Sequence, residues 1–326
     1  MTKKIWLSGG GLLMIMLGLL GLGAVRQPTE TIYTALPDST DTYYRPFLKD
    51  LQRFNRALQY HAAAGDTFTT LTTKVTTLRH TKFHYPDIWL RDVAPVITTR
   101  MVKFDYRPSY LPQADGRYLN RQFTKFLNRR YHYTSSPLVL DGGNVQWNGH
   151  DTVVVTRQIW RDNPDWSHRE IVQELQRKLA VRHVIIIPKE PGDVLGHSDG
   201  MVKFIGKRTL FVNDFREDPG FLARVKRAIH QTVPDMTMVT LPSAYTAKGQ
   251  YDRHIASAKG LYINMLQTPH AVYVPQYGLR QDHAVLRLIQ RHVNQPVIPV
   301  SVGHLSTLGG SVHCLTWEVP HGKFEK

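Results

Sequence analysis

Apolar residues recur at helical spacing in several separate stretches of the chain. In the clearest one, Ile171, Leu175 and Leu179 fall on one face of a helix, while Glu170 and Gln173 fall mostly off it. The same period predicts helices over residues 44–63, 119–130, 167–181, 219–233 and 281–293. We therefore expect amphipathic helices that cover a folded body.

Short runs rich in β-branched and aromatic residues lie between these helices. They occupy residues 184–187, 209–212, 271–274 and 297–300. No Ser-, Gly- or Pro-rich linker and no block of like charge interrupts the interior of the chain. The pattern predicts an α/β fold in one domain behind an N-terminal segment.

The alternation contains a repeat: a short strand with a polar residue, a turn, a second strand, a helix and a closing strand. One polar residue from each unit gives spacings of 49, 58, 65 and 50 residues, for Asp92, Asp141, Asp199, Asn264 and Cys314. Five such units could close around an axis and send these side chains toward the centre. An ordinary α/β sandwich with incidental polar residues at its strand ends is the alternative.

The N-terminal segment has the pattern of a membrane signal. Lys3 and Lys4 precede 21 residues, 5–25, that carry no charge, and six glycines in this run argue against a buried core helix. Small residues at 21–24 fit signal cleavage, whereas the length of the run fits a retained anchor. In both cases residues 1–26 predict an exported body, secreted or anchored to the membrane.

The 326-residue chain is basic, with a formal net charge of +15. An exported cationic protein is expected to adhere to an anionic cell envelope or to lipid headgroups. We do not expect nucleic acid as a partner, because the basic residues are scattered and match no nucleic-acid module. The single cysteine, Cys314, excludes internal disulfides and leaves one thiol to explain.

Four polar stretches are candidates for chemistry: residues 89–95, 140–144, 196–200 and 309–316. In the last stretch two glycines precede Cys314, so the backbone can approach a ligand closely. A cysteine attacks as thiolate and needs a base or a positive charge nearby, which His197 or His313 could supply. The alternative is that Cys314 is a small buried apolar residue.

His197 and Asp199 lie two residues apart, so both would face the same side of a strand. Such a pair could handle protons or bind a metal. We expect no metal, because the sequence has no HExxH motif and no cysteine pair. If Asp92 and Asp199 converge, each can accept two parallel N–H bonds from a planar guanidinium. Asp141 is a further candidate for binding the substrate. The alternative for Asp92 is a local ion pair with Arg91, and the alternative for Asp141 is a purely structural role in a turn.

Taken in order, these stretches resemble the agmatine deiminase and bacterial peptidylarginine deiminase family of guanidino-group-modifying enzymes. The matching elements are Arg-Asp-x-x-Pro, acidic-Gly-Gly, Gly-His-x-Asp, Tyr-x-Asn and Gly-Gly-x-x-His-Cys-x-Thr, which begin at Arg91, Asp141, Gly196, Tyr262 and Gly309. The resemblance spans about residues 86–320. It places a deiminase core at residues 86–326 and leaves residues 27–85 as an unassigned N-terminal part of the same body.

This resemblance implies the pentein fold, a five-bladed α/β propeller of pseudo-fivefold ββαβ units, behind the membrane segment. It implies that Cys314 attacks the guanidinium carbon, that Asp92 and Asp199 hold the guanidinium nitrogens, and that His197 protonates the leaving ammonia and later activates water. Asn264 would lie beside the site. A covalent Cys-thiouronium intermediate would then hydrolyse to a ureido product, with no metal or organic cofactor.

Departures from the family pattern fall at the substrate end. Ala94 and Lys203 replace a usual glycine and arginine, and Trp317 and Glu318 stand where the agmatine enzymes usually carry glutamines. The substrate is therefore expected to be an agmatine-like compound or an arginine in a peptide, held by a rim that includes Trp89 or Trp317. Amidino transfer to an amine and a catalytically silent, envelope-anchored binding protein are the other hypotheses.

Overall fold

The computed structural model describes residues 29–244 and 248–326. The signal segment predicted at residues 1–26 lies outside these ranges. Within them, none of the helices combines the length and the apolar character that a membrane crossing needs.

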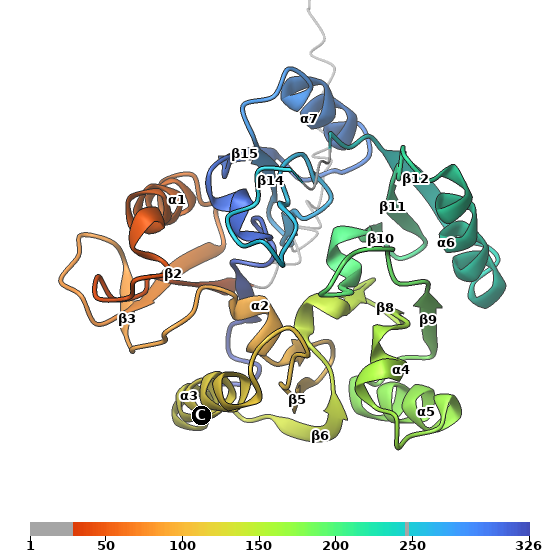
Figure 1. Cartoon of the computed structure of the whole chain (residues 1–326), viewed down its shortest axis with the longest axis horizontal. Helices are drawn as coiled ribbons and strands as arrows, with labels where there is room; N and C mark the ends of the chain where they lie inside the picture. The colour runs from red at the N-terminus through yellow and green to blue at the C-terminus, as the bar shows by residue number, and fades with distance from the viewer. Residues whose placement is uncertain (1–28, 245–247) are drawn as a thin grey trace, which may run out of the picture.

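The described strands form five small sheets of one design (Figure 1). In each, a short inner strand runs antiparallel to a middle strand, and a helical connection leads to a third strand parallel to the middle one. Four sheets follow the chain in order: β4-β5-β6, β7-β8-β9, β10-β11-β12 and β13-β14-β15. The α/β class expected from the sequence is confirmed.

These four sheets and their helices have the following bounds. The first contains β4 (Val96–Ile97), β5 (Met101–Asp105), α3 (Gln113–Arg130) and β6 (Thr134–Val139). The second contains β7 (Gln146–Trp147), β8 (Thr152–Thr156), α4 (Gln158–Asp162), α5 (His168–Leu179) and β9 (His183–Ile187). The third contains β10 (Val202–Gly206), β11 (Thr209–Asn213), α6 (Pro219–Thr232) and β12 (Thr237–Leu241). The fourth contains β13 (Leu266–Gln267), β14 (Val272–Gln276), α7 (Asp282–Gln290) and β15 (Val297–Ser301).

The remaining sheet joins the two ends of the described chain. Its inner strand β16 (Trp317–Pro320) runs antiparallel to β1 (Glu30–Ala35), with Thr31 opposite Val319. The chain continues through the short helix η1 (Arg45–Phe47) and α1 (Leu48–Tyr60) to β2 (Asp66–Thr72), which is parallel to β1 and carries the edge strand β3 (His80–Lys82). Residues 27–85, which the sequence leaves unassigned, therefore supply the helix and the other strands of the sheet that contains β16.

Apolar burial explains why each helix lies against its sheet. On α5, Ile171, Leu175 and Leu179 are fully buried, in one cluster with Val153 and Val184 of β8 and β9. Figure 1 shows α1, α3, α5, α6 and α7 around the outside, with the sheets between them and the centre. The inner ends of the sheets are therefore free to carry polar residues.

The five polar residues of the repeat lie in the turns that precede the inner strands. Asp92 lies in the one-turn helix α2 (Leu90–Val93) before β4, and Asp141 precedes the 3-10 turn η2 (Gly142–Asn144) before β7. Asp199 lies in η3 (Ser198–Gly200) before β10. Asn264 and Cys314 occupy turns before β13 and β16. The expectation that these residues, and the pair His197 and Asp199, lie on strands was wrong, because the tight turns leave only short inner strands.

Candidate active site

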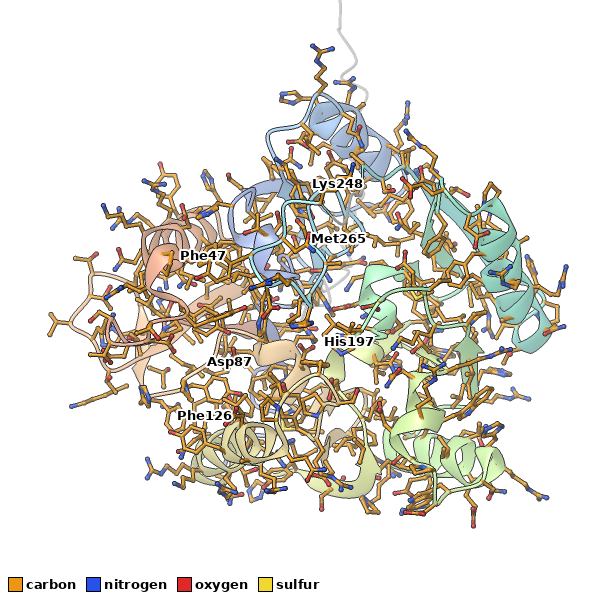
Figure 2. All side chains as sticks on the ribbon, viewed as in Figure 1. Phe47, Asp87, Phe126, His197, Lys248 and Met265 are labelled. Atoms are coloured by element: carbon orange, nitrogen blue, oxygen red, sulfur yellow. The ribbon has the colours of Figure 1, made fainter. Side chains whose placement is uncertain are left out.

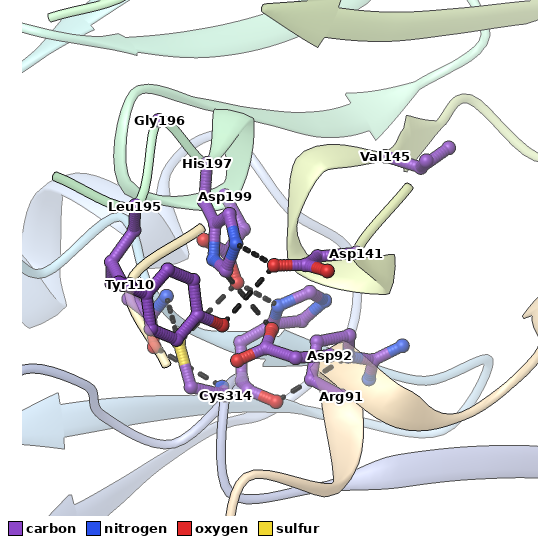
Figure 3. A network of polar contacts seen from close by, with 12 residues as sticks. Arg91, Asp92, Tyr110, Asp141, Val145, Leu195, Gly196, His197, Asp199 and Cys314 are labelled. Atoms are coloured by element: carbon purple, nitrogen blue, oxygen red, sulfur yellow. Dashed lines mark hydrogen bonds and ion pairs between the residues drawn. The ribbon is translucent and has the colours of Figure 1, made fainter. Parts of the chain in front are cut away.

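The turns before the inner strands bring the candidate residues into one buried network (Figure 3). His197, Asp199 and Cys314 come together there with Asp92 and Asp141, and each of these five side chains is about nine-tenths buried or more. Figure 2 shows His197 near the middle of the molecule. The site is thus assembled from residues more than 200 positions apart in the sequence.

Cys314 is held by the turn before β13. Asn264 donates from its side-chain nitrogen to the Cys314 sulfur at 3.1 Å, and its side-chain oxygen accepts from the Cys314 backbone N–H at 3.4 Å. The backbone N–H of His313 donates to the carbonyl of Asn264 at 3.2 Å. These bonds fix where the sulfur lies.

The thiol also donates to Asp199 Oδ2 at 3.4 Å. Burial raises the pKa of the Cys314 thiol well above its usual range, and the carboxylates of Asp199 and Asp92 raise it further. The free site therefore stores the nucleophile as a neutral thiol. A cation bound between the two carboxylates would offset their charge and favour the thiolate.

His197 lies between two carboxylates. Its Nε2 is 3.1 Å from Asp141 Oδ2, and its Nδ1 is 3.6 Å from Asp92 Oδ1. Burial opposes charge on the ring, but Asp92 and Asp141 outweigh it and raise the pKa of His197 to about 10. His197 is therefore an imidazolium at neutral pH, ready to donate a proton.

Asp92 has an unsatisfied oxygen at the site. Its Oδ1 is buried and accepts no hydrogen bond from any described residue. Burial raises the pKa of Asp92 to about 8; His197 opposes this shift, while Asp141 and Asp199 add to it. Arg91 does not form the local ion pair considered for Asp92, because Arg91 pairs with Glu318 on β16. His197 is the nearest charge to this oxygen but makes no hydrogen bond with it, so Oδ1 is free to accept an N–H bond from a cationic ligand.

The second carboxylate, Asp199, is oriented by His313, whose Nδ1 lies 2.7 Å from Asp199 Oδ2. Burial lowers the pKa of His313 to about 3, and Arg91 and Lys203 add to this. His313 is therefore neutral and donates a hydrogen bond. Burial would raise the pKa of Asp199, but the bond from His313 outweighs it and lowers the pKa below its ordinary value. Asp199 is ionised at neutral pH.

Tyr110 was missed by the sequence reasoning. Its hydroxyl donates to Asp141 Oδ2 at 3.1 Å, the same oxygen that His197 contacts, and its ring meets the His197 ring edge to face. Tyr110 stands in the loop between β5 and α3, in none of the four polar stretches. Nothing local in the sequence marks it, because only the fold brings it to Asp141.

Two candidate substrate residues lie in different surroundings. Trp89 lies beside Gly310, where a side-chain carbon would come within 2.3 Å of the Trp89 ring, and it also lines a large outer cavity. Trp317 is 1% exposed, stacks on Tyr33, and donates from its ring N–H to the carbonyl of Pro95. The structure therefore places Trp89 at the approach to the thiol and Trp317 in the core, away from it.

The thiol opens into a small pocket of about 60 Å³ lined by His197, Asp199, Asn264 and Cys314. This is several times the roughly 10–15 Å³ that a cavity needs to admit one water, so a small ligand group can reach the thiol. No group of metal-ligating side chains that could hold an ion occurs in residues 29–244 or 248–326.

The outer cavity, which we call the vestibule, has a volume of about 1070 Å³ and shares Glu190, Asp193, Val194 and Ile255 with the small pocket. Its wall carries two basic side chains, Arg161 and Lys189, and His254. Against these stand the carboxyl groups of Asp41, Asp87, Asp115, Glu190, Asp193 and Asp252. In a strongly basic chain, the entrance to the thiol is thus an acidic surface.

A thiol, an imidazolium and paired carboxyl groups on an α/β frame define a class of site that suits attack on a planar cationic carbon. The family model of the Porphyromonas-type peptidyl-arginine deiminases matches residues 26–320, and the chain belongs to this family.

Known proteins of this kind are similar over much of the chain. An agmatine deiminase of Pseudomonas aeruginosa is 22% identical over 275 residues, which cover 72% of this chain and 74% of that protein. The crystallised agmatine deiminase of C. jejuni is 18% identical with a TM-score of 0.75, covering 91% of this chain and 94% of that one. A DDAH from P. aeruginosa complexed with citrulline is 14% identical with a TM-score of 0.54, covering 90% of this chain and 100% of that one.

These structural neighbours establish a shared fold, consistent with the pentein fold that the resemblance implied. The chain spans about three-fifths of the length of the first curated relatives, from Lactococcus lactis, Selenomonas ruminantium and Enterococcus faecalis.

Proposed function

We propose that this chain is a hydrolytic deiminase that converts a guanidino group to a ureido group and ammonia. The observation that carries this function is the position of the Cys314 thiol in a small pocket beside Asp199 and near Asp92, whose Oδ1 accepts no hydrogen bond. In this proposal the five sheets are the blades of a pentein propeller, whose axis passes through the site.

The first half of the reaction forms a covalent adduct. Asp92 and Asp199 accept N–H bonds from the guanidinium and fix its plane against the sulfur. The cation favours ionisation of Cys314, whose proton passes to solvent, and the thiolate attacks the central carbon to form a C–S bond. His197 then donates its proton to one nitrogen as the C–N bond breaks, so that ammonia leaves and a thiouronium remains.

The second half uses the same groups in reverse roles. His197, now neutral, takes a proton from water as the water oxygen attacks the thiouronium carbon. The C–S bond breaks and the thiolate is restored, and the product loses its hydroxyl proton to solvent and leaves as the neutral ureido compound. Asp141 keeps the imidazole oriented in both halves, since it contacts Nε2 at 3.1 Å. No step calls on a metal or an organic cofactor.

We propose an arginine side chain within a polypeptide as the substrate. The vestibule is far larger than the small pocket and is lined by carboxyl groups that would attract a cationic segment. Exposed apolar and aromatic side chains gather at its mouth: Tyr43, Tyr118, Val194 and, packed against Tyr43, Tyr251. Contiguous exposed aromatic surface of this kind is typical of a macromolecular contact.

Ureido-product and ammonia release from three substrates tests this function. The full chain is assayed with an arginine-containing basic peptide, free arginine and agmatine, beside Cys314→Ala. We expect turnover of the peptide that the variant loses. Turnover of agmatine alone would refute the peptide substrate, and silence on all three with folded protein would refute the deiminase. A requirement for an added amine acceptor would favour amidino transfer.

We also propose that the body acts outside the cytoplasmic membrane. The support is the uncharged run at residues 5–25 behind Lys3 and Lys4. Cell fractionation with a C-terminal tag tests this, and recovery of the full-length chain from the cytosol would contradict it.

A further inference from the structure

A second cavity, of about 630 Å³, lies along the inner strands. Residues from all five of these strands line it, among them Ile97, Trp147, Lys203, Gln267 and Glu318. None of its lining residues lines the small pocket at Cys314. The cavity is therefore separate from both the small pocket and the reaction that we assign to it.

A thin polar layer separates this cavity from the active site. Arg91 forms an ion pair with Glu318, and its Nε donates to the backbone carbonyl of His313 at 3.4 Å. His313 lines the cavity and also holds Asp199 on the opposite side. A ligand in the cavity would thus lie one side chain away from the substrate carboxylate.

Lys203 is the unusual feature of this cavity. Its side chain lines the cavity from β10, is only 8% exposed, and makes no hydrogen bond or ion pair with any described residue. The neighbouring carboxylate of Glu318 is already paired with Arg91. A buried ammonium without a partner is costly, and burial lowers the pKa of Lys203 to about 8.

The other groups of the cavity favour an anionic ligand. Lys207 and Lys323 also line it. Glu30 does too, but burial raises the pKa of Glu30 to about 8, and nearby Glu318 and Asp66 add to this shift, so Glu30 is largely neutral at pH 7. The charges of Arg91 and Glu318 cancel each other, so the lysines leave the cavity with an excess of positive charge.

The lining of the cavity also contains apolar residues, among them Pro95, Ile97, Trp147, Phe204 and Pro269. We propose that this cavity is a second binding site, for a small organic carboxylate whose anionic group pairs with Lys203 while its apolar part lies against these residues. The ligand would supply the partner that the protein itself does not provide for the ammonium.

Titration calorimetry with benzoate and its neutral isostere benzamide tests the proposal on the full chain carrying Cys314→Ala. Agmatine at a saturating concentration keeps the small pocket filled. We expect benzoate to bind at least tenfold more tightly than benzamide and not to be displaced by agmatine. Equal affinity for the two probes, or displacement of benzoate by agmatine, would overturn the proposal without touching the proposed reaction.

Variants at the lysines locate the site. Lys203→Met should abolish the preference for benzoate, Lys203→Arg should keep it, and Lys207→Met on the more exposed wall should change it by less than threefold. A preference that survives in Lys203→Met would refute the assignment to Lys203. If Lys203→Met does not fold, the comparison of benzoate with benzamide on the parent protein still decides whether an anion site exists.

Discussion

Asp92 must change its protonation state when a guanidinium binds. In the free site its pKa is raised to about 8, chiefly by burial, and one of its oxygens has no hydrogen-bond partner. A cation between Asp92 and Asp199 reverses this preference, because an ionised Asp92 then gains both charge and N–H donors. Substrate binding and loss of the Asp92 proton are therefore coupled.

This coupling predicts a pH-dependent affinity. Agmatine should bind to Cys314→Ala more tightly as the pH rises from 6 to 8, by up to tenfold for each pH unit. The reason is that a smaller fraction of Asp92 is protonated at higher pH and has to lose its proton on binding. Calorimetry across this range measures the dissociation constant. In Asp92→Asn the affinity should be weaker and nearly independent of pH. A flat profile in the Cys314→Ala parent would contradict the coupling.

Gly143 leaves the space in which the Asp92 and His197 side chains meet. A side-chain carbon on Gly143 would lie 2.5 Å from Asp92 Oδ1 and 2.7 Å from His197 Nδ1. Gly143→Ala is therefore expected to displace both groups and lower kcat/KM by roughly 100-fold or more. Gly206→Ala, where the nearest atom would be 3.9 Å away, is the matched control. Activity within threefold of the parent in Gly143→Ala would rule out this tight arrangement.

At the residue scale, the site residues that lie in local sequence motifs could be predicted. The turns that bear Asp92, Asp141, His197, Asp199 and Cys314 all contain or adjoin glycines or short polar stretches, which are visible in one dimension. The positions of two residues could not be predicted from local motifs. Tyr110 reaches Asp141 only through the fold, and Trp317 turns inward because alternate residues of a strand face opposite sides.

Helix α5 shows how local chemistry sets the limits of an element. The Ser167 side chain accepts from the backbone N–H of Glu170, and the Glu170 carboxylate accepts from the backbone N–H of Ser167. This capping box satisfies donors that the first turn leaves unpaired. Ile171, the first apolar residue of the buried face that holds α5 on its sheet, follows Glu170 directly.

Removal of this cap should affect stability but not chemistry. Ser167→Ala is expected to lower the free energy of unfolding by about 1 kcal/mol, which lowers Tm by roughly 1 to 2 °C. Thermal denaturation measures the change, and kcat/KM should stay within twofold of the parent. Ser167→Asp retains a capping oxygen and serves as the control. An unchanged Tm in Ser167→Ala would show that the cap contributes little.

The helix and strand predictions succeeded where the apolar period was strong. All five predicted helices overlap α1, α3, α5, α6 and α7, and the four predicted strands overlap β9, β11, β14 and β15. The inner strands were harder to predict because several are only two residues long, as in β4 and β13. The start of α3 was placed six residues late, since Gly116 and exposed polar residues weaken the apolar pattern of its first turns.

On the scale of the whole molecule, the fifth sheet depends on pairing between the two ends of the described chain. β1 lies between β16 and β2, so residues 30–33 have a neighbouring strand on both sides. No local sequence pattern shows this, because Thr31 and Val319 are 288 residues apart. Residues 27–85 therefore remained unassigned until the pairing was seen.

The stability of the whole fold should depend on this sheet. Thr31→Pro removes a backbone donor from the central strand β1 and is expected to lower the free energy of unfolding by about 3 kcal/mol or more. Activity should fall with it, since β16 follows directly on the turn that carries Cys314. Thr31→Val, which suits a strand, is the control. Denaturant unfolding measures the stability of both variants. A midpoint for Thr31→Pro equal to that of the parent would disprove that the fold depends on this sheet.

The same pairing sets an order of events during synthesis. β1 leaves the ribosome long before its antiparallel partner β16 is made, because the paired residues Thr31 and Val319 are 288 positions apart. Cys314 emerges just before β16, so the thiol and the strand that completes the fifth sheet arrive together. A nascent chain that has not reached residue 314 holds the carboxylates of the site but not its thiol, so the site is assembled only when this sheet can form.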